Sequence, residues 1–435
     1  MKKIGLLLFA LCLGINVGAQ VILSDKAEIS LLTSAPYDEE VFTLYGHAAL
    51  RIHDPLRELD LIFNYGIFDF SKPHFIYRFA KGETDYMLGV ANFPDYVTEY
   101  QLRGSDVTEQ VLDLLPGEKN RIWQALLENY QPENRVYRYN FFFDNCATRL
   151  AALTEKNVYG TIRYTDPPEP KTFRELINHC TRNHPWLTFG CDLALGSPTD
   201  RVATPHEMMF LPFYLKEAFA NAKVIDPAGK ERPLVKETRV IGASSASADK
   251  ALAPAKETMA STKGSITSTE EISTPVKKME EPAEEVEESD ETPPFIASPM
   301  AASLLLFLLV AGLTFVEWRK KIYFRWLDCL LFFVAGAGGV ILFFLSFISV
   351  HPATWPNWSL VWLNPLDLFA VILFCVKKAR KAAYYYHFIN FAALSMMLAG
   401  WYWIPQHLNA AFIPLVATLW IRSGYGIYRK KWKIG

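Results

Sequence analysis

Five long apolar segments in the last third of the chain restrict its fold more than any other feature. They cover residues 299–316, 327–349, 360–376, 386–404 and 408–424. Each is near the length that a helix needs to cross a bilayer. The sequence therefore predicts an α-helical membrane domain of five spans over residues 299–435.

The charges beside these segments predict how they are oriented. Lys and Arg follow the first, third and fifth segments, with Arg422 counted in the last group, whereas residues 350–359 and 405–407 contain neither. By the positive-inside rule the basic groups and the C-terminus face the cytoplasm, and the chain before residue 299 lies outside. Residues 1–19 agree, because two lysines, an apolar run and small residues before Gln20 form a signal peptide. An uncleaved anchor is the alternative.

The part of the chain between signal and membrane domain divides in two. Residues 20–242 have the apolar pattern of one mixed α/β domain. Residues 243–298 are rich in Ser, Thr, Ala, Glu and Pro and nearly lack aromatic residues, which predicts a disordered, flexible tether. The net charge of −2 gives no indication of nucleic-acid binding.

Three of the six cysteines, Cys146, Cys180 and Cys191, fall in the exported domain. An odd number of thiols in an oxidising compartment favours one that stays free. Cys180 and Cys191 are close enough in sequence to form a disulfide, which would leave Cys146 reduced. The sequence does not decide whether this disulfide forms.

Cys146 is the residue that most suggests chemistry. It follows a predicted strand over 137–143 and stands in the first turn of a predicted helix over 144–157, which Asp144 and Asn145 are expected to cap. Unpaired backbone N–H groups and the helix dipole favour a thiolate there. Such a thiol with an imidazole in reach is an acyl-transfer nucleophile. The alternative is a buried structural thiol.

His47 is the preferred partner of Cys146. It lies in a predicted strand over 41–52 among small residues that leave room for a helix. Asn64, on a predicted strand over 60–70, would come near His47 in a hairpin and could orient the imidazole, with Tyr45 as runner-up. Core packing of His47 and a turn role for Asn64 are the alternatives. The competing histidines are His53, His74, His179, His184 and His206.

Three further features have two interpretations each. Residues Phe141–Phe143 could line an acyl slot or pack in a strand. His351 begins an aromatic-rich outer loop, which could dock the exported domain or form a lipid entrance. Asp367, in the third apolar segment with Asn364, is a functional candidate because acids in membranes are costly, or a partner in a helix–helix hydrogen bond.

Several motifs together resemble the Lnb family, the lipoprotein N-acyltransferases of Bacteroidota. They are YGHAALR at Tyr45–Arg51, NYGIFDF at Asn64–Phe70, NFFFDNCATR at Asn140–Arg149, Cys191-Asp192 to Gly196, Asp200, Phe210-Leu211-Pro212, His351-Pro352 and Asn364-Pro365. The order of His strand, polar strand and Cys helix also resembles the circularly permuted papain-like superfamily. The resemblance covers nearly the whole chain apart from the tether.

The resemblance implies an α+β permuted papain-like catalytic domain in the periplasm, a flexible linker and a five-span domain in the bacterial inner membrane. It implies ping-pong acyl transfer without a cofactor or metal. Cys146 would accept an acyl chain from a phospholipid as a thioester, His47 would move the protons, and a diacylated lipoprotein would be the acceptor. Arg149, within the Cys146 motif, is a secondary site candidate.

Three other functions compete with this one. A periplasmic Cys peptidase acting on cell-wall peptides would use the same Cys–His pair, although it seldom needs five spans. A phospholipase would pass the acyl chain to water instead of an amine. A membrane-anchored, non-enzymatic scaffold would use His47 and Cys146 only for packing.

Overall fold

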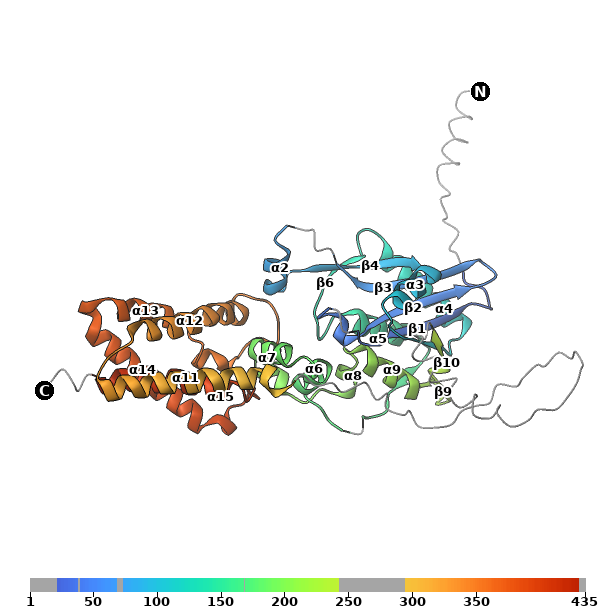
Figure 1. Ribbon diagram of the computed structural model, residues 1–435. Coiled ribbons are helices and arrows are strands. Elements are labelled where there is room, and N and C mark those ends of the chain that lie inside the picture. Colours follow the sequence, from blue (N-terminus) through green and yellow to red (C-terminus); the bar gives the residue numbers. More distant parts are fainter. Residues whose placement is uncertain (1–21, 38–39, 69–72, 168, 242–293, 430–435) are drawn as a thin grey trace, which may run out of the picture.

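The computed structural model describes residues 22–37, 40–68, 73–167, 169–241 and 294–429. The described chain forms an N-terminal α/β domain and a C-terminal helical domain that extends from one end of it (Figure 1). The predicted signal peptide and nearly all of the predicted tether lie outside the described residues.

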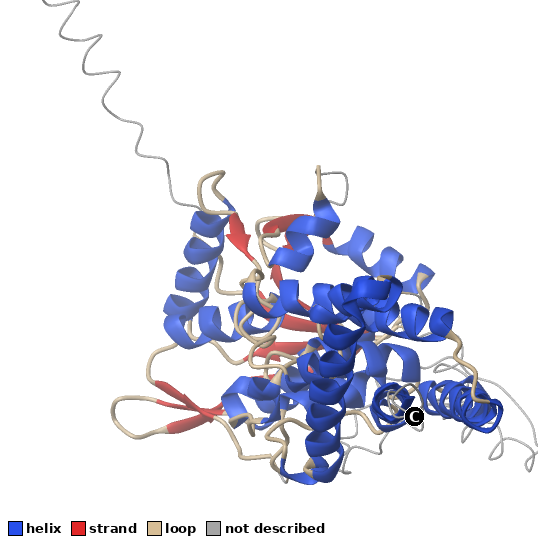
Figure 2. Ribbon diagram, turned by 90° about the vertical axis from the view of Figure 1, so that its left-hand side faces the viewer, coloured by secondary structure: helices blue, strands red, loops and turns tan. Residues whose placement is uncertain are grey.

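A seven-stranded antiparallel sheet forms the centre of the N-terminal domain. Its order is β10-β5-β1-β2-β3-β4-β6, and a second sheet has the order β7-β8-β9. Figure 2 looks along the helical domain and shows the strands behind it among helices. The strands are β1 (Glu28–Ser34), β2 (His47–Asp54), β3 (Leu59–Ile67), β4 (Asp85–Asn92), β5 (Val107–Leu112), β6 (Val136–Arg138), β7 (Thr161–Arg163), β8 (Lys223–Ile225), β9 (Glu231–Pro233) and β10 (Val235–Ile241).

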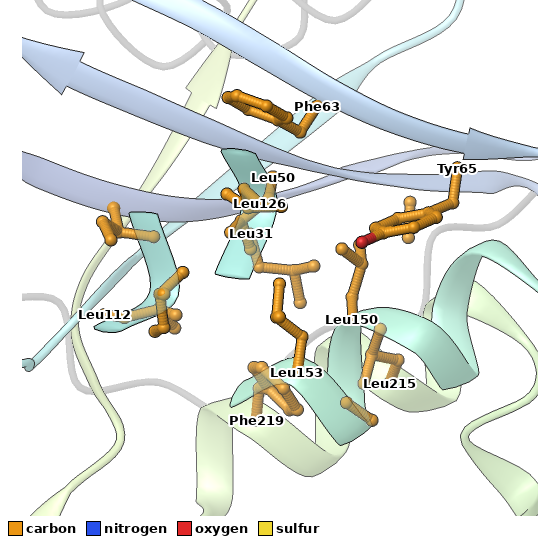
Figure 3. Close-up of a cluster of buried hydrophobic side chains, with 14 of the residues drawn as sticks. Leu31, Leu50, Phe63, Tyr65, Leu112, Leu126, Leu150, Leu153, Leu215 and Phe219 are labelled. Atoms are coloured by element: carbon orange, nitrogen blue, oxygen red, sulfur yellow. The ribbon is translucent and has the colours of Figure 1, made fainter. Parts of the chain in front are cut away.

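Helices cover both faces of the large sheet. One face packs on α4, α5 and α9 through a core that includes Leu31, Leu50, Phe63, Leu150 and Phe219 (Figure 3). The opposite face packs on α3 through a smaller apolar cluster. The helices of this domain are α2 (Phe75–Lys81), α3 (Phe93–Leu102), α4 (Pro116–Tyr130), α5 (Cys146–Asn157), α6 (Phe173–Thr181), α7 (Pro185–Ala194), α8 (Pro205–Met208) and α9 (Pro212–Asn221).

One element differs from the sequence-based expectation. The predicted strand over 137–143 ends at Arg138, because Asn140 Oδ1 accepts hydrogen bonds from the backbone N–H groups of Phe142 and Phe143 and closes a tight turn. Phe142 packs in a core cluster, whereas Phe143 is exposed.

Each predicted apolar segment of the C-terminal domain forms a helix over most of its length. By length and composition, the described residues contain three helices able to cross a membrane: α11, α12 and the continuous segment Trp358–Cys375, which includes α13. The helices α14 and α15 pack against each other, and α15 also packs on α11. The bounds are α11 (Pro299–Lys320), α12 (Arg325–Phe347), α13 (Leu366–Cys375), α14 (Arg380–Ala399) and α15 (Phe412–Tyr428).

Arg422 does not belong to a basic connection, contrary to the expectation from the sequence. It lies within α15 and is fully buried, where it bonds Asp328 at 2.6 Å and also pairs with Glu317. A charge buried among helices needs such partners, because a lone charge there is strongly destabilising. Arg422 therefore fixes α15 against α11 and α12.

The two domains are bonded directly to each other through the connection after α12. The backbone N–H of Gly196 donates to Ala353 O at 2.7 Å, and that of Ser197 donates to Pro356 O at 2.8 Å. On α2, Lys81 O accepts from the backbone N–H of Val350 at 2.9 Å. The sheet and its helices are thereby held against one end of the membrane domain (Figure 1).

Candidate active site

Cys146 is the first residue of α5, and a network around Asn145 determines where this helix begins. Asn145 Oδ1 accepts from the Thr148 N–H at 2.9 Å, and Thr148 Oγ1 accepts from the Asn145 N–H at 2.8 Å. The amide of Asn145 also donates to the carbonyl oxygens of Phe141 and Phe210. Asn145 is therefore a helix cap tied to two loops, and the thiol lies at the positive end of the helix dipole.

His47 and Asn64 lie on the adjacent strands β2 and β3. His47 Nε2 donates to Asn64 Oδ1 at 2.5 Å. His47 also forms a side-chain hydrogen bond with Cys146. Since Nε2 is occupied by Asn64, the ring nitrogen available to the sulfur is Nδ1. The three residues proposed from the sequence thus form one connected series, Cys146–His47–Asn64.

The pKa values of the thiol and the imidazole move in opposite directions. Burial acts to raise the pKa of the Cys146 thiol, but the positive His47, its hydrogen bond and the backbone N–H groups of Ala48 and Ala147 together lower it. Burial acts to lower the pKa of His47, but the Cys146 thiolate and the Asn64 hydrogen bond together raise it. The pair therefore favours a thiolate beside an imidazolium, which is the reactive form of a Cys nucleophile.

Gly66 provides the space in which Cys146 and His47 meet. The pairing of β3 with β4 shifts between Asn64 and Ile67, and Gly66 has φ +97° at this bulge. A Cβ on Gly66 would lie 3.8 Å from Cys146 Cβ and 3.9 Å from His47 Cε1. Bulges often re-aim side chains beside active sites. The sequence interpretation noted Gly66 only as part of a motif.

Asp144 and Arg149 lie beside the site but contact each other rather than the thiol. Arg149 bonds both carboxylate oxygens of Asp144, at 2.6 and 2.8 Å, and stacks over the Tyr137 ring at 3.6 Å. Both residues line a cavity of about 870 Å³ between α4 and α5, whose lining includes neither Cys146 nor His47. The structure therefore places Asp144 and Arg149 in an ion pair beside the site, where each bonds the other.

Tyr45, the second sequence candidate for orienting His47, lies elsewhere. Its hydroxyl bonds Cys191, and its ring packs edge-on against Phe141 at 5.0 Å. Cys180 and Cys191 are not joined by a disulfide in the part of the chain that the structure describes.

The two candidates in the membrane half also lie outside the Cys146 site. His351 Nε2 donates to Phe79 O at 2.9 Å, which ties the outer loop to α2. Asp367 is buried and bonds the Tyr386 hydroxyl. Among the residues that the structure describes, no group of three or more His, Cys, Asp or Glu side chains could hold a metal ion.

A buried polar network at the domain junction was not foreseen from the sequence. The Arg174 side chain is only 1% exposed. It bonds Asp200 at 2.7 Å, Asp192 at 3.1 Å and the carbonyl oxygens of Leu195 and Gly196. Asp192 also accepts from Asn409 of the membrane domain at 2.9 Å. The sequence does not predict this network, because its residues are far apart in the chain.

Two family models match the chain, in the same order as its two domains. The Lnb N-terminal periplasmic domain matches residues 20–179, and the Lnb transmembrane domain matches residues 290–433. No curated protein and no solved structure matches the chain. The matched regions include Cys146, His47 and Asn64 together with all five helices of the membrane domain. The chain therefore belongs to the Lnb family, as a membrane protein with a periplasmic N-terminal domain.

Proposed function

We propose that this protein is a lipoprotein N-acyltransferase, which moves an acyl chain from a phospholipid to the α-amino group of a diacylated lipoprotein. The observation that carries the proposal is the Cys146–His47–Asn64 series in a domain bonded to the end of a membrane domain. The phospholipid donor and the lipoprotein acceptor are both anchored in the membrane, so an acyl-transfer nucleophile held close to the bilayer could reach both.

In the first half-reaction, the Cys146 thiolate attacks the ester carbonyl carbon of a phospholipid. A C–S bond forms, the C–O bond to glycerol breaks, and imidazolium His47 gives its proton to the departing alkoxide. The products are a thioacyl enzyme and a lysophospholipid. Asn64 accepts from Nε2 of His47 throughout and keeps Nδ1 directed at the sulfur.

In the second half-reaction, the α-amino group of the lipoprotein attacks the thioester carbon. The C–N bond forms, the C–S bond breaks, and the now neutral His47 takes a proton from the attacking nitrogen. The thiolate and imidazolium are restored, and the lipoprotein leaves as an amide. No group beyond the two substrates is consumed.

Apolar side chains on α2 support access from the membrane. Ile76 is 82% exposed, and the ring centroid of Tyr77 lies 5.9 Å from that of Phe344 in α12. From α2, a series of aromatic rings in contact leads into the soluble domain, towards the segment that precedes Cys146. The rings, in order, are those of Phe79, Phe75, Phe68, Tyr86 and Tyr139. We propose that an acyl chain reaches the thiol along these rings.

Three structural proposals accompany this function. The helices α14 and α15 cross the inner membrane as the fourth and fifth spans, which places the C-terminus in the cytoplasm. The strand with His47, the strand with Asn64 and the helix with Cys146 correspond to the permuted papain-like order. The third proposal is the division of the chain: a signal peptide that ends at residue 19, a periplasmic domain that ends at residue 242 and a linker that ends at residue 298.

The test is an intact-mass measurement on full-length protein incubated with phospholipid vesicles, before and after adding a diacylated lipopeptide. We expect an acyl adduct on Cys146 that hydroxylamine removes, and its transfer to the lipopeptide amine. Cys146→Ser and His47→Ala should abolish both, while Cys191→Ser, at a free thiol outside the site, should retain them. Acyl release to water without amide formation would indicate a phospholipase instead. Absence of any adduct, with cleavage of cell-wall peptides, would indicate a peptidase.

A further inference from the structure

A second cavity lies at the end of the membrane domain that is remote from the soluble domain. It has a volume of about 410 Å³ and lies where α12 and α14 begin and where α13 and α15 end. Figure 1 shows these helix ends on the side away from the sheet. Five basic side chains line it: Arg325, Lys377, Arg380, Lys381 and Arg429.

The positive charge of this cavity is not balanced by acidic groups of the chain. None of its lining residues is acidic, and within the described chain Arg325, Lys377, Arg380 and Lys381 form no ion pair. The nearby acids on α11 and α12 are Glu317 and Asp328, which are already bonded to Arg422. Like charges gathered in one hollow repel one another, and a bound anion would reverse that cost.

The N-terminus of α14 adds to this positive potential. This helix begins at the cavity with Arg380 as its first residue, and it has neither a side-chain cap nor an acidic residue in its first turn. The N-terminus of α12 is different, because Asp328 lies in its first turn and Glu317 accepts a hydrogen bond from the Phe324 N–H. Cations at a helix N-terminus are unfavourably placed against the dipole, whereas an anion is favourably placed, so the first turn of α14 suits a bound anion.

His387 supplies an independent indication of a missing partner. It is 2% exposed, lines the cavity and stacks on Phe374 at 4.6 Å. Its Nδ1 atom is buried and has no hydrogen-bond partner. Buried polar atoms are nearly always bonded, so an unpaired nitrogen on a side chain that lines the cavity points to a ligand or water as its partner.

We propose that this cavity binds the phosphate group of an anionic phospholipid in the leaflet opposite the soluble domain. The helix ends that form it are at the level of lipid headgroups, and basic pockets between membrane helices suit such headgroups. Arg429 Cζ lies 3.4 Å above the centroid of the Tyr323 ring, so the stacked pair forms one side of the cavity. This site is separate from Cys146 and does not depend on the proposed reaction.

The experiment is native mass spectrometry of full-length protein in detergent, with phosphatidylglycerol, phosphatidylethanolamine or inorganic phosphate as the probe. We expect one phosphatidylglycerol to bind more tightly than phosphatidylethanolamine. Lys377→Gln combined with Arg380→Gln should weaken it roughly 30-fold, from about 1 kcal/mol for each basic residue. Lys378→Gln is the matched control, because Lys378 is adjacent in sequence but does not line the cavity.

Thermal unfolding of the same variants provides a second measurement that does not require the lipid to survive ionisation. Phosphatidylglycerol should raise the unfolding temperature of the wild-type protein and of Lys378→Gln, but not that of the double variant. Equal binding of phosphatidylglycerol by the double variant and Lys378→Gln would overturn the proposal. Inorganic phosphate that binds as tightly as the lipid would overturn the assignment to a headgroup.

Discussion

At the scale of residues, the site depends on how one imidazole is held. Asn64 Oδ1 accepts from Nε2 of His47, so the tautomer and the ring orientation are fixed by a single neutral amide. A neutral orienting group leaves the proton on the imidazole and does not compete for it. Asn64 therefore acts as a positioning residue through His47.

The first prediction concerns this amide. Asn64→Ala should lower kcat by about 10²-fold, because the unheld imidazole samples orientations that do not face the sulfur. Lipid binding, and with it KM, should change little. Steady-state acyl transfer measures both quantities, with Asn129→Ala as a control at an amide that donates to the Tyr65 hydroxyl. Unchanged kcat would remove Asn64 from the site.

The second prediction concerns pH. The lowered pKa of Cys146 depends on positive His47, so the thiolate should persist below about pH 8.5, the ordinary thiol value. In His47→Ala the cation is lost and burial dominates, so the rise of thiol reactivity should move to higher pH. Alkylation of Cys146 by a small iodoacetamide, followed by intact mass across pH, measures this. Coincident profiles for the two proteins would contradict it.

At the scale of elements, the decisive feature is the bulge in β3. A regular strand would carry a side chain at position 66, where the thiol of α5 meets the imidazole of β2. Gly66 removes that side chain and adopts a φ of +97° that other residues rarely take. The bulge thus brings a helix terminus and a strand terminus together.

The third prediction tests this bulge. Gly66→Ala should cost roughly 1–3 kcal/mol of stability through backbone strain, and it should reduce acyl transfer at least tenfold because the strained bulge shifts next to the thiol and the imidazole. Gly104→Ala is a matched control, because Gly104 has φ +66° and no atom within 4 Å of the added Cβ. We expect Gly104→Ala to lose stability but keep the reactivity of Cys146. Denaturant unfolding and acylation rates distinguish the two effects; equal activity in both variants would contradict the role of Gly66.

At the scale of the whole molecule, the soluble domain is joined to the membrane domain by backbone hydrogen bonds and by the Arg174 network. The loop after α7 is held by Arg174 on one side and by the connection after α12 on the other. At Gly196 the contact is so close that a Cβ would lie 2.4 Å from Pro356 O. The orientation of the N-terminal domain relative to the membrane domain therefore depends on this loop.

The fourth prediction separates docking from chemistry. Gly196→Ala should reduce acyl transfer from vesicle lipids at least tenfold, because the added methyl group forces the loop away from the membrane domain. Alkylation of Cys146 by a small soluble reagent should be unchanged. Gly190→Ala in α7, where a Cβ meets nothing within 4 Å, should leave both assays unchanged. Full vesicle activity in Gly196→Ala would show that docking at this loop is not needed.

The sequence predicted those features that are encoded locally. The helix start at Cys146 follows from the capping residues before it, and the hairpin that joins His47 to Asn64 follows from two alternating strands. The bulge at Gly66 and the Arg174 network could not be predicted, because they depend on pairing between distant elements. The sequence groups Arg422 with the basic residues after the fifth apolar segment, and only the packing of the helices reveals its partners Glu317 and Asp328.

Under the proposed function, the enclosure of Cys146, which is only 8% exposed, has a consequence for the lifetime of the thioacyl form. A fatty chain attached to so sheltered a sulfur would meet little solvent, so spontaneous loss of the chain would be slow compared with delivery to an incoming amine. The thioacyl protein would then persist between encounters with the amine substrate, and a sample already loaded with an acyl chain should stay loaded until that amine is added.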